Sequence, residues 1–359
     1  MLLTFNRQTV LLASMMMLGS QAVAQTQSDS QAITIDFAAY VGDSEFVCGE
    51  SYDNVGTAAS TITPMDFRFY VSDVALIDSN GEAVSLELEQ DGKWQYQNTV
   101  LLDFEDGTAA CDNGTAETNM TIVGTVPAGD YQSLQFTMGV PKNLNHDDAA
   151  IAPSPLNLTS MWWNWQGGYK FLRADLETDK AISTVGETSS SHSSSQNGEL
   201  VNEQTAHSTH TEGQQTTHQT SRQASIFKNG QGTHSQTSST QTTHADGGKH
   251  GGSQHQMSSN AYMIHLGSTG CSQSAQSSLF GCANPNRVEV MLEDFNFDKD
   301  VVVADLAELL AQSDLSTNQA NTPNGCMSSP EDADCAPILK NLNLSATGSD
   351  SEQYFFFVE

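Results

Sequence analysis

The chain has 359 residues and a formal net charge of −30 at pH 7, from 43 acidic and 13 basic residues. This charge argues against nucleic acid or an anionic membrane surface as partner, because both carry negative charge themselves. It is typical of a well-solvated acidic surface that attracts cations or a basic protein.

Residues 1–24 have the pattern of a removed secretory signal peptide. Arg7 gives a basic start, residues 10–18 are nearly all apolar, and Ala22 and Ala24 form a small-x-small cleavage pattern. The apolar run is too short for a permanent membrane helix, and no later stretch is apolar enough for one. We therefore expect an exported protein, periplasmic or secreted, without a membrane span.

Short apolar runs separated by turn signals follow from residue 30 to residue 182. Turn sequences such as "DSNGEA", "EQDGKW" and "VPAGDY" lie between them. Apolar residues at every second position indicate half-buried strands: Ile33, Ile35 and Phe37 in one run, Phe67, Phe69 and Val71 in a second, and Leu134, Phe136, Met138 and Val140 in a third. This pattern predicts an antiparallel β-sandwich or barrel.

Residues 183–258 differ sharply in composition, being rich in Ser, Thr, Gln, Gly and His. Such a segment has too few apolar residues to compensate for its ordering entropy, so we predict a long disordered insertion. It contains eight of the ten histidines, which suit either weak metal binding or an inert spacer. The domain prediction is one β-sandwich, residues 30–182 plus 259–359, interrupted by this insertion.

The strand pattern resumes after the insertion in "AYMIHLGS" and "NRVEVMLEDFNF". The stretch "VVVADLAELLAQSD" predicts a helix, with Leu306, Leu309 and Leu310 at helical spacing. The final "QYFFFVE" predicts a closing strand. The predicted fold is therefore mainly β: an antiparallel β-sandwich with one or two short helices and a long disordered His-rich insertion.

Six cysteines, an even number in an exported chain, indicate disulfides. Sequence proximity suggests two pairs and leaves a third, although six cysteines allow fifteen pairings: Cys271–Cys282, Cys326–Cys335 and Cys48–Cys111. Thiolate metal ligands are the alternative, but the chain has no CxxC pair.

Two histidines belong to the predicted sandwich. His146 lies in a Pro- and Asn-rich loop and His265 in a strand. A lone strand histidine is more commonly a packed core residue than a ligand. With Met161, however, the two imidazoles suit Cu(I), which binds nitrogen and thioether donors. The spacing alone does not show that the three residues meet in space.

Three of the four tryptophans lie in "TSMWWNWQGGYKF". In a continuous strand, Trp163, Trp165 and Tyr169 would share one face, and Trp162 the other. That face could be buried core, or an aromatic platform for a sugar or another protein. No nucleophile elbow, phosphate loop, zinc-protease motif or pair of catalytic carboxylates stands out, so we do not expect an enzyme.

Several long stretches together resemble the MbnP-like family. They are "DFRFYVSDVALI", "VLLDFEDGTAAC", "GTVPAGDYQSLQFTMGVPKNLNH", "SPLNLTSMWWNWQGGYKFLRAD" and "HLGSTGC". The resemblance covers nearly all of the mature chain except the insertion. Two features depart from the family pattern: six cysteines where four are typical, and the His-rich insertion itself.

The resemblance implies a periplasmic β-sandwich protein of bacterial copper handling that binds Cu(I). It also implies a partner, a MauG-like dihaem cytochrome c peroxidase of the MbnH type, which alone carries haem. That enzyme oxidises a tryptophan of its partner to kynurenine. The positions that match are Trp163 and Trp165 as modified residues, with His146 and His265 as metal ligands. The alternative function is an extracellular module that binds carbohydrate or protein through its aromatic face.

Overall fold

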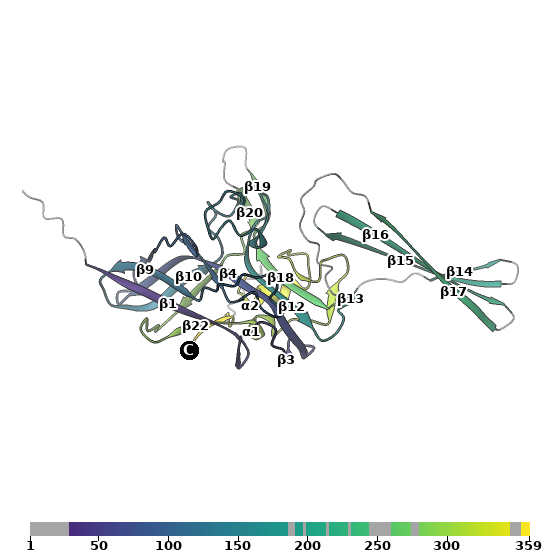
Figure 1. The fold of residues 1–359 in the computed structure, drawn as a ribbon, viewed down its shortest axis with the longest axis horizontal. Helices are drawn as coiled ribbons and strands as arrows, with labels where there is room; N and C mark the ends of the chain where they lie inside the picture. Colours follow the sequence, from purple (N-terminus) through teal and green to yellow (C-terminus); the bar gives the residue numbers. More distant parts are fainter. Residues whose placement is uncertain are drawn as a thin grey trace, which may run out of the picture.

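The computed structural model describes residues 29–185, 260–273, 280–344 and 353–359, and the backbone of the strands between residues 191 and 243. The predicted signal peptide, residues 1–24, lies outside the described residues. Two β-sheets form the body of the molecule (Figure 1). In these parts of the chain, no helix is both long and apolar enough to cross a membrane.

The smaller sheet has six strands, in the order β25-β22-β1-β9-β6, with β2 paired to β1. Their bounds are β1 Ser30–Val41, β2 Ser44–Glu45, β6 Glu87–Leu88, β9 Thr121–Pro127, β22 Val301–Asp305 and β25 Phe356–Val358. Phe356 is buried in β25, which confirms the predicted closing strand.

The larger sheet has eleven strands, in the order β21-β10-β4-β12-β18-β24, with β3, β5, β7, β8 and β11 beside this path. Their bounds are β3 Tyr52–Val55, β4 Ser60–Asp78, β5 Ala83–Ser85, β7 Gln95–Tyr96, β8 Thr99–Asp103, β10 Tyr131–Met138, β11 Trp162–Asn164, β12 Gly168–Thr178, β18 Ala261–Gly267, β21 Val288–Leu292 and β24 Gly325–Cys326. The 19-residue β4 is the centre of this sheet, because β10 and β12 flank it.

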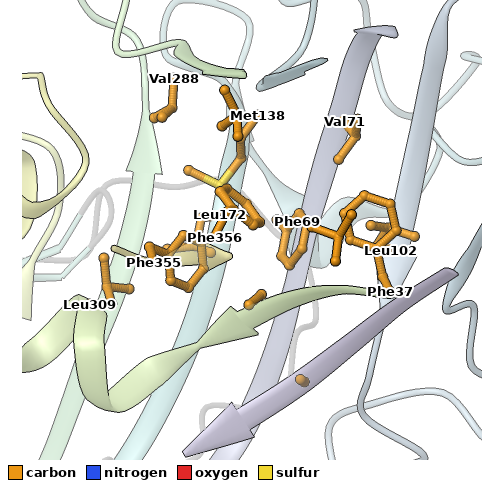
Figure 2. Close-up of a cluster of buried hydrophobic side chains, with 14 of the residues drawn as sticks. Phe37, Phe69, Val71, Leu102, Met138, Leu172, Val288, Leu309, Phe355 and Phe356 are labelled. Atoms are coloured by element: carbon orange, nitrogen blue, oxygen red, sulfur yellow. The ribbon is translucent and has the colours of Figure 1, made fainter. Parts of the chain in front are cut away.

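The main hydrophobic core lies between the two sheets (Figure 2). Phe37 of β1 contacts Phe69 of β4 and Phe136 of β10, with ring centroids 6.4 and 5.7 Å apart. Phe356 of β25 contacts Phe69 and Phe136 at 5.5 and 5.2 Å. These contacts join the sheets face to face, so the alternating apolar residues of the sequence do mark the inner faces.

Two details of the predicted fold are corrected. The predicted helix begins later, because its β-branched valines form β22; the helix α1 is only Leu306–Leu310. Asp305 caps it, accepting a hydrogen bond from the Ala307 N–H at 2.7 Å. A second short helix, α2, is Cys335–Asn341. The sheets are also mixed: among the described strands, the pairs β1–β22, β18–β24 and β13–β23 are parallel.

The insertion leaves and re-enters the sandwich at one place. β12 and β18 are antiparallel neighbours, with Glu177 opposite Ala261. Ser183–Val185 forms β13, which pairs with β23, Thr317–Gln319, in a separate two-stranded sheet. The predicted bounds of the insertion stay a prediction. Its described backbone comprises β14 Ser191–Gln196, β15 Glu199–Glu212, β16 Gln215–Lys228 and β17 Gln231–Thr243.

These four strands form an antiparallel sheet that extends beyond β13 (Figure 1). Among the described strands they pair only with one another, so the insertion contributes no strand to the sandwich. The disorder predicted for the segment stays a prediction. The side chains of its eight histidines lie outside the described residues.

Candidate functional site

The aromatic stretch forms a β-hairpin that is preceded by the 3₁₀ turn η1, Thr159–Met161. In this hairpin β11 runs antiparallel to the start of β12, with Trp162 opposite Tyr169. Asn164 shapes the turn: its Oδ1 accepts hydrogen bonds from the Gln166 and Gly167 N–H groups at 2.9 and 2.8 Å. Asn side chains commonly stabilise turns in this way.

The three tryptophans of the hairpin consequently have different environments. The prediction that Trp163, Trp165 and Tyr169 share one strand face is wrong, because the turn separates them. Trp162 packs against a buried apolar cluster, and its indole nitrogen is buried without a hydrogen-bond partner among the described atoms. Trp163 is half-buried, whereas Trp165 is 56% exposed.

Trp163 is held in place by two glycines. A Cβ added at Gly267 would lie 2.6 Å from Trp163 Cζ3, and one added at Gly167 would lie 3.3 Å from Trp163 Cβ. The same indole lines an open cleft of about 470 Å³, together with Asn164, Gln166, Ser268, Thr269, Cys271 and Met327. Trp163 is therefore both fixed in position and accessible from solvent.

His146 lies in the loop after β10, beside Trp165. Its Nδ1 is 3.2 Å from the Trp165 carbonyl oxygen, which can only accept a hydrogen bond. Its Nε2 is 3.3 Å from the Asn145 amide nitrogen and 3.6 Å from Cys282 Sγ. These partners place the proton on Nδ1 and the lone pair on Nε2. Burial lowers the pKa of His146, which keeps the ring neutral at pH 7.

The three predicted disulfides are all present, as Cys48–Cys111, Cys271–Cys282 and Cys326–Cys335. Cys271 and Cys282 face each other across the hairpin of β19, Thr269–Gln273, and β20, Phe280–Asn284. The ring of Phe280 stacks on His146, with centroids 4.4 Å apart. The hairpin of β19 and β20 therefore contacts His146 through Phe280 and Cys282, and it lines the cleft of Trp163 through Cys271.

His265 lies on β18 in a different environment. It is only 8% exposed, and its Nε2 is 2.7 Å from Asp175 Oδ1. Burial lowers the pKa of His265, although the Asp175 carboxylate opposes this effect. Burial by itself raises the pKa of Asp175, but His265 and Arg173 together hold that pKa below its ordinary value. Asp175 is therefore ionised, and its hydrogen bond occupies Nε2 of His265.

A buried ionic network extends from His265 across the outer face of the larger sheet. Arg68 is fully buried; it forms a two-point ion pair with Asp66 and places Nη1 3.1 Å from Glu105 Oε1. Arg173 Nη1 is 3.1 Å from the same Asp66 carboxylate. Two arginines on neighbouring strands thereby link several acidic groups with His265.

The sequence analysis did not identify this network. Asp66 and Arg68 alternate with Phe67 and Phe69, which is the pattern of an ordinary solvent-facing strand side. A usable signal was the second charged pair at the same spacing, since "RAD" on β12 places Arg173 opposite Arg68. Two such pairs on adjacent strands indicate a cross-strand ionic cluster.

Met161 lies in a third environment. It is fully buried in an apolar cluster on the outer face of the larger sheet, with Tyr70, Leu101, Val140, Leu144, Ala149, Leu156, Tyr169 and Phe171. The structure therefore places His146, His265 and Met161 in separate surroundings. Among the described His, Cys, Asp and Glu side chains, one group has three ligand atoms within 4.8 Å of one another: His146, Cys271 and Cys282.

Comparison with known proteins gives one family and one fold. The family model of MbnP matches residues 30–242 of the chain. No curated protein sequence matches it significantly. Among solved structures, MbnP from Methylosinus trichosporium has a similar fold, with a TM-score of 0.63 and 24% sequence identity, over 92% of this chain and 98% of that one.

Proposed function

The chain belongs to the MbnP family, and we propose that it is an exported copper-binding protein, not an enzyme, in which a MauG-like dihaem peroxidase converts a tryptophan to kynurenine. The observation that carries the proposal is the arrangement around one disulfide. Trp163 lines a cleft with Cys271, and the neutral His146 contacts Cys282. Disulfides persist mainly in oxidising compartments such as the periplasm, which supports export.

Trp163 is the tryptophan best suited to modification. Its indole is accessible from the cleft, as an external oxidant requires, yet it is fixed against Gly267. A fixed position matters, because a modified residue tunes a nearby metal only if its new polar groups are held in place. Trp165 is more exposed, and its ring meets Phe280 edge to face with centroids 5.9 Å apart, a looser contact than that of Trp163 with Gly267. Trp162 is also only partly buried, but it packs against the buried apolar cluster with its indole nitrogen buried, and it does not line the cleft.

The proposed conversion has a simple balance. Two equivalents of peroxide supply two oxygen atoms to the C2–C3 bond of the indole, which opens to N-formylkynurenine, and two water molecules are released. Hydrolysis then removes the formyl group as formate and leaves an aniline and a ketone. The partner's haem activates the peroxide, and this chain contributes the substrate side chain and its surroundings.

His146 is the predicted copper ligand with the best geometry. Its Nε2 lone pair is not used by a strong donor, whereas Nε2 of His265 is bonded to Asp175. Neutral imidazole is a good ligand for copper. For His265 to bind through Nε2, Asp175 would have to be displaced, and Met161 could bind only if its cluster opened. Those two residues remain proposed ligands with less support.

Intact-mass analysis with peptide mapping tests the modification. After co-expression with the dihaem partner, we expect one tryptophan of the wild-type chain to lose one carbon and gain one oxygen. Trp163→Phe should abolish this change, and Trp165→Phe, the matched control, should retain it. An unmodified wild-type chain under conditions where the partner is active would overturn the proposal.

Cu(I) titration against a chromophoric chelator tests the ligands. We expect His146→Gln to weaken binding roughly tenfold or more, since it removes a ligand nitrogen. Met161→Leu conserves volume in the apolar cluster, so a weaker affinity in this variant would show that the thioether of Met161 also binds copper. Equal affinities of wild type and His146→Gln would exclude His146 as a ligand.

The alternative function, an aromatic face for carbohydrate or protein, has less support. The hairpin breaks the expected row of aromatic side chains, so that only Trp165 of its three tryptophans is largely exposed. A flat stacking surface for a sugar ring needs accessible indole faces.

A further inference from the structure

We propose that the Cys271–Cys282 disulfide masks two further ligands of the His146 copper site, which become available when a dithiol reduces it. In the reduced protein, the two cysteine sulfurs and the Nε2 atom of His146 bind one Cu(I) ion. This proposal rests on the proposed function for the choice of copper and for His146 as a ligand. The site needs neither a modified tryptophan nor the haem partner.

The ligand atoms are already close to the required positions. Nε2 of His146 is 3.6 Å from Cys282 Sγ, and all three ligand atoms lie within 4.8 Å of one another. Metal–nitrogen and metal–sulfur bonds of about 2.0–2.3 Å at tetrahedral angles separate adjacent ligand atoms by roughly 3.5 Å. Binding therefore requires little more than separation of the two sulfurs.

The histidine is oriented for this role by its other contacts. The Trp165 carbonyl accepts the Nδ1 proton, and Phe280 stacks on the ring. Such partners fix the tautomer and the ring plane of a ligating histidine. The lone pair of Nε2 is accordingly directed toward the sulfurs. Its hydrogen-bond donor is the Asn145 side-chain amide, and at 3.3 Å this bond is long.

The disulfide is also the most accessible of the three. Cys271 and Cys282 are both partly exposed, and Cys271 borders the cleft of Trp163. The other two disulfides each include a fully buried cysteine: Cys111 in one, and both Cys326 and Cys335 in the other. A thiol reductant and a metal ion can thus reach this pair from solvent, and thiol–disulfide exchange depends on such access.

The chemistry balances with a dithiol as the reductant. The dithiol supplies two electrons and two protons, becomes a disulfide itself, and leaves two protein thiols. Cu(I) then binds both sulfurs and the imidazole, and the two thiol protons pass to solvent without further electron transfer. Thiolate and imidazole are soft donors that favour Cu(I) over hard cations.

The experiment uses the full chain, produced without the haem partner and kept anaerobic. The oxidised protein and the dithiol-reduced protein, after removal of the dithiol, are titrated with Cu(I) against a chromophoric chelator. We expect reduction to strengthen Cu(I) binding roughly tenfold or more at an unchanged stoichiometry, and to add ultraviolet absorption from sulfur–copper charge transfer. Thiol labelling with peptide mapping should locate the new thiols at Cys271 and Cys282.

Three variants keep the test specific. His146→Gln should remove most of the gain in affinity on reduction, whereas Lys142→Gln, an exposed position in the same loop, should keep it. The double variant Cys271→Ser, Cys282→Ser should show no gain at all. An equal Cu(I) affinity before and after reduction, an unaffected His146→Gln, or reduction confined to another disulfide would each overturn the proposal. None of these results bears on tryptophan oxidation, which is read separately by mass.

Discussion

The two histidines of the sandwich show how different surroundings give one residue type different capacities. Burial lowers the pKa of both, although His265 is buried and His146 only partly so. Their hydrogen-bond partners differ more. Nε2 of His265 is bonded to an ionised carboxylate, whereas Nε2 of His146 faces an amide and a sulfur atom. Nε2 is therefore available as a ligand atom in His146, whereas in His265 it is committed to a buried pair with Asp175.

The regions around them differ in the same sense. His265 lies within a network of buried charges, where each group depends on its neighbours for compensation. His146 lies between a loop and a hairpin whose disulfide is partly exposed. We therefore expect substitutions in the region of His265 to lower the free energy of unfolding more than substitutions in the region of His146. Three predictions test this comparison, from the largest effect to the smallest.

Removal of Arg68 should have the largest effect on stability. Arg68→Met leaves Asp66 and Glu105 buried without their main counter-charge, so we expect the free energy of unfolding to fall by about 3–5 kcal/mol. The control is Lys93→Met, because Lys93 pairs with Glu117 at 2.6 Å in an exposed position. Such surface pairs contribute about 0–1 kcal/mol. Urea unfolding of both variants measures the difference, and similar losses would contradict a dominant role for the buried network.

Asp103 should give the network a distinct pH dependence. Burial raises the pKa of Asp103 to about 8, although Arg68 opposes this. The ordinary pKa of an aspartate is about 3.9, so between about pH 4 and pH 8 the native state holds a proton that the unfolded state has released. The contribution of this carboxyl to the free energy of unfolding therefore falls as pH rises through that window, and stays constant above it.

The substitution Asp103→Asn removes the cost of ionising this buried carboxyl. Urea unfolding at pH 5 and pH 9 measures the effect on the free energy of unfolding. Relative to wild type, the variant should gain about 4 kcal/mol on going from pH 5 to pH 9. Glu117→Gln, at the exposed end of the surface ion pair, is the control and should follow the wild-type profile. If Asp103→Asn followed that profile as well, Asp103 would not be the group that holds the proton.

Much of the fold could be predicted because its core follows strand periodicity. Ile35, Phe37, Phe69 and Phe136 alternate with polar residues, and each points into the core between the sheets. The disulfides were predictable because close spacing in sequence favoured two of the pairs. The helix was misplaced where Val301 begins β22, since a run of apolar residues suits either element.

The site was less predictable, because it depends on contacts between distant segments. The alternation around Trp163 suggested one strand, although Gly167 and Gly168 were turn signals in the same stretch. The burial of Arg68 depends on the pairing of β4 with β8 and β12, which local sequence does not specify. That His146 lies next to Cys282, 136 residues later, follows only from the tertiary structure.

Gly267 is the point where the two regions meet, and it gives the smallest of the three effects. It follows His265 on β18, and its N–H donates to Ser328 Oγ, which in turn donates to the His265 carbonyl. In Gly267→Ala the new methyl group would lie 2.6 Å from both Trp163 Cζ3 and the Tyr169 carbonyl oxygen. Overpacking of this kind typically costs about 1–3 kcal/mol, and we expect about 2 here, because the methyl group displaces the indole toward the cleft and also forces β18 away from the Tyr169 carbonyl.

Gly281→Ala is the matched control for this substitution. Gly281 also lies in a strand, but a Cβ there meets nothing within 4 Å, so its loss should stay within about 0.5 kcal/mol. Urea unfolding gives both values, and tryptophan fluorescence reports whether the indole has moved. A shifted emission of Gly267→Ala would show that the Trp163 indole has moved. If imidazole NMR also showed an unchanged His265–Asp175 pair, the substitution would have altered the cleft without altering the ionic network. Perturbation of both regions would mean that they behave as one rigid unit. The two histidines would then differ only in the hydrogen-bond partners of their Nε2 atoms, and not in the rigidity of their surroundings.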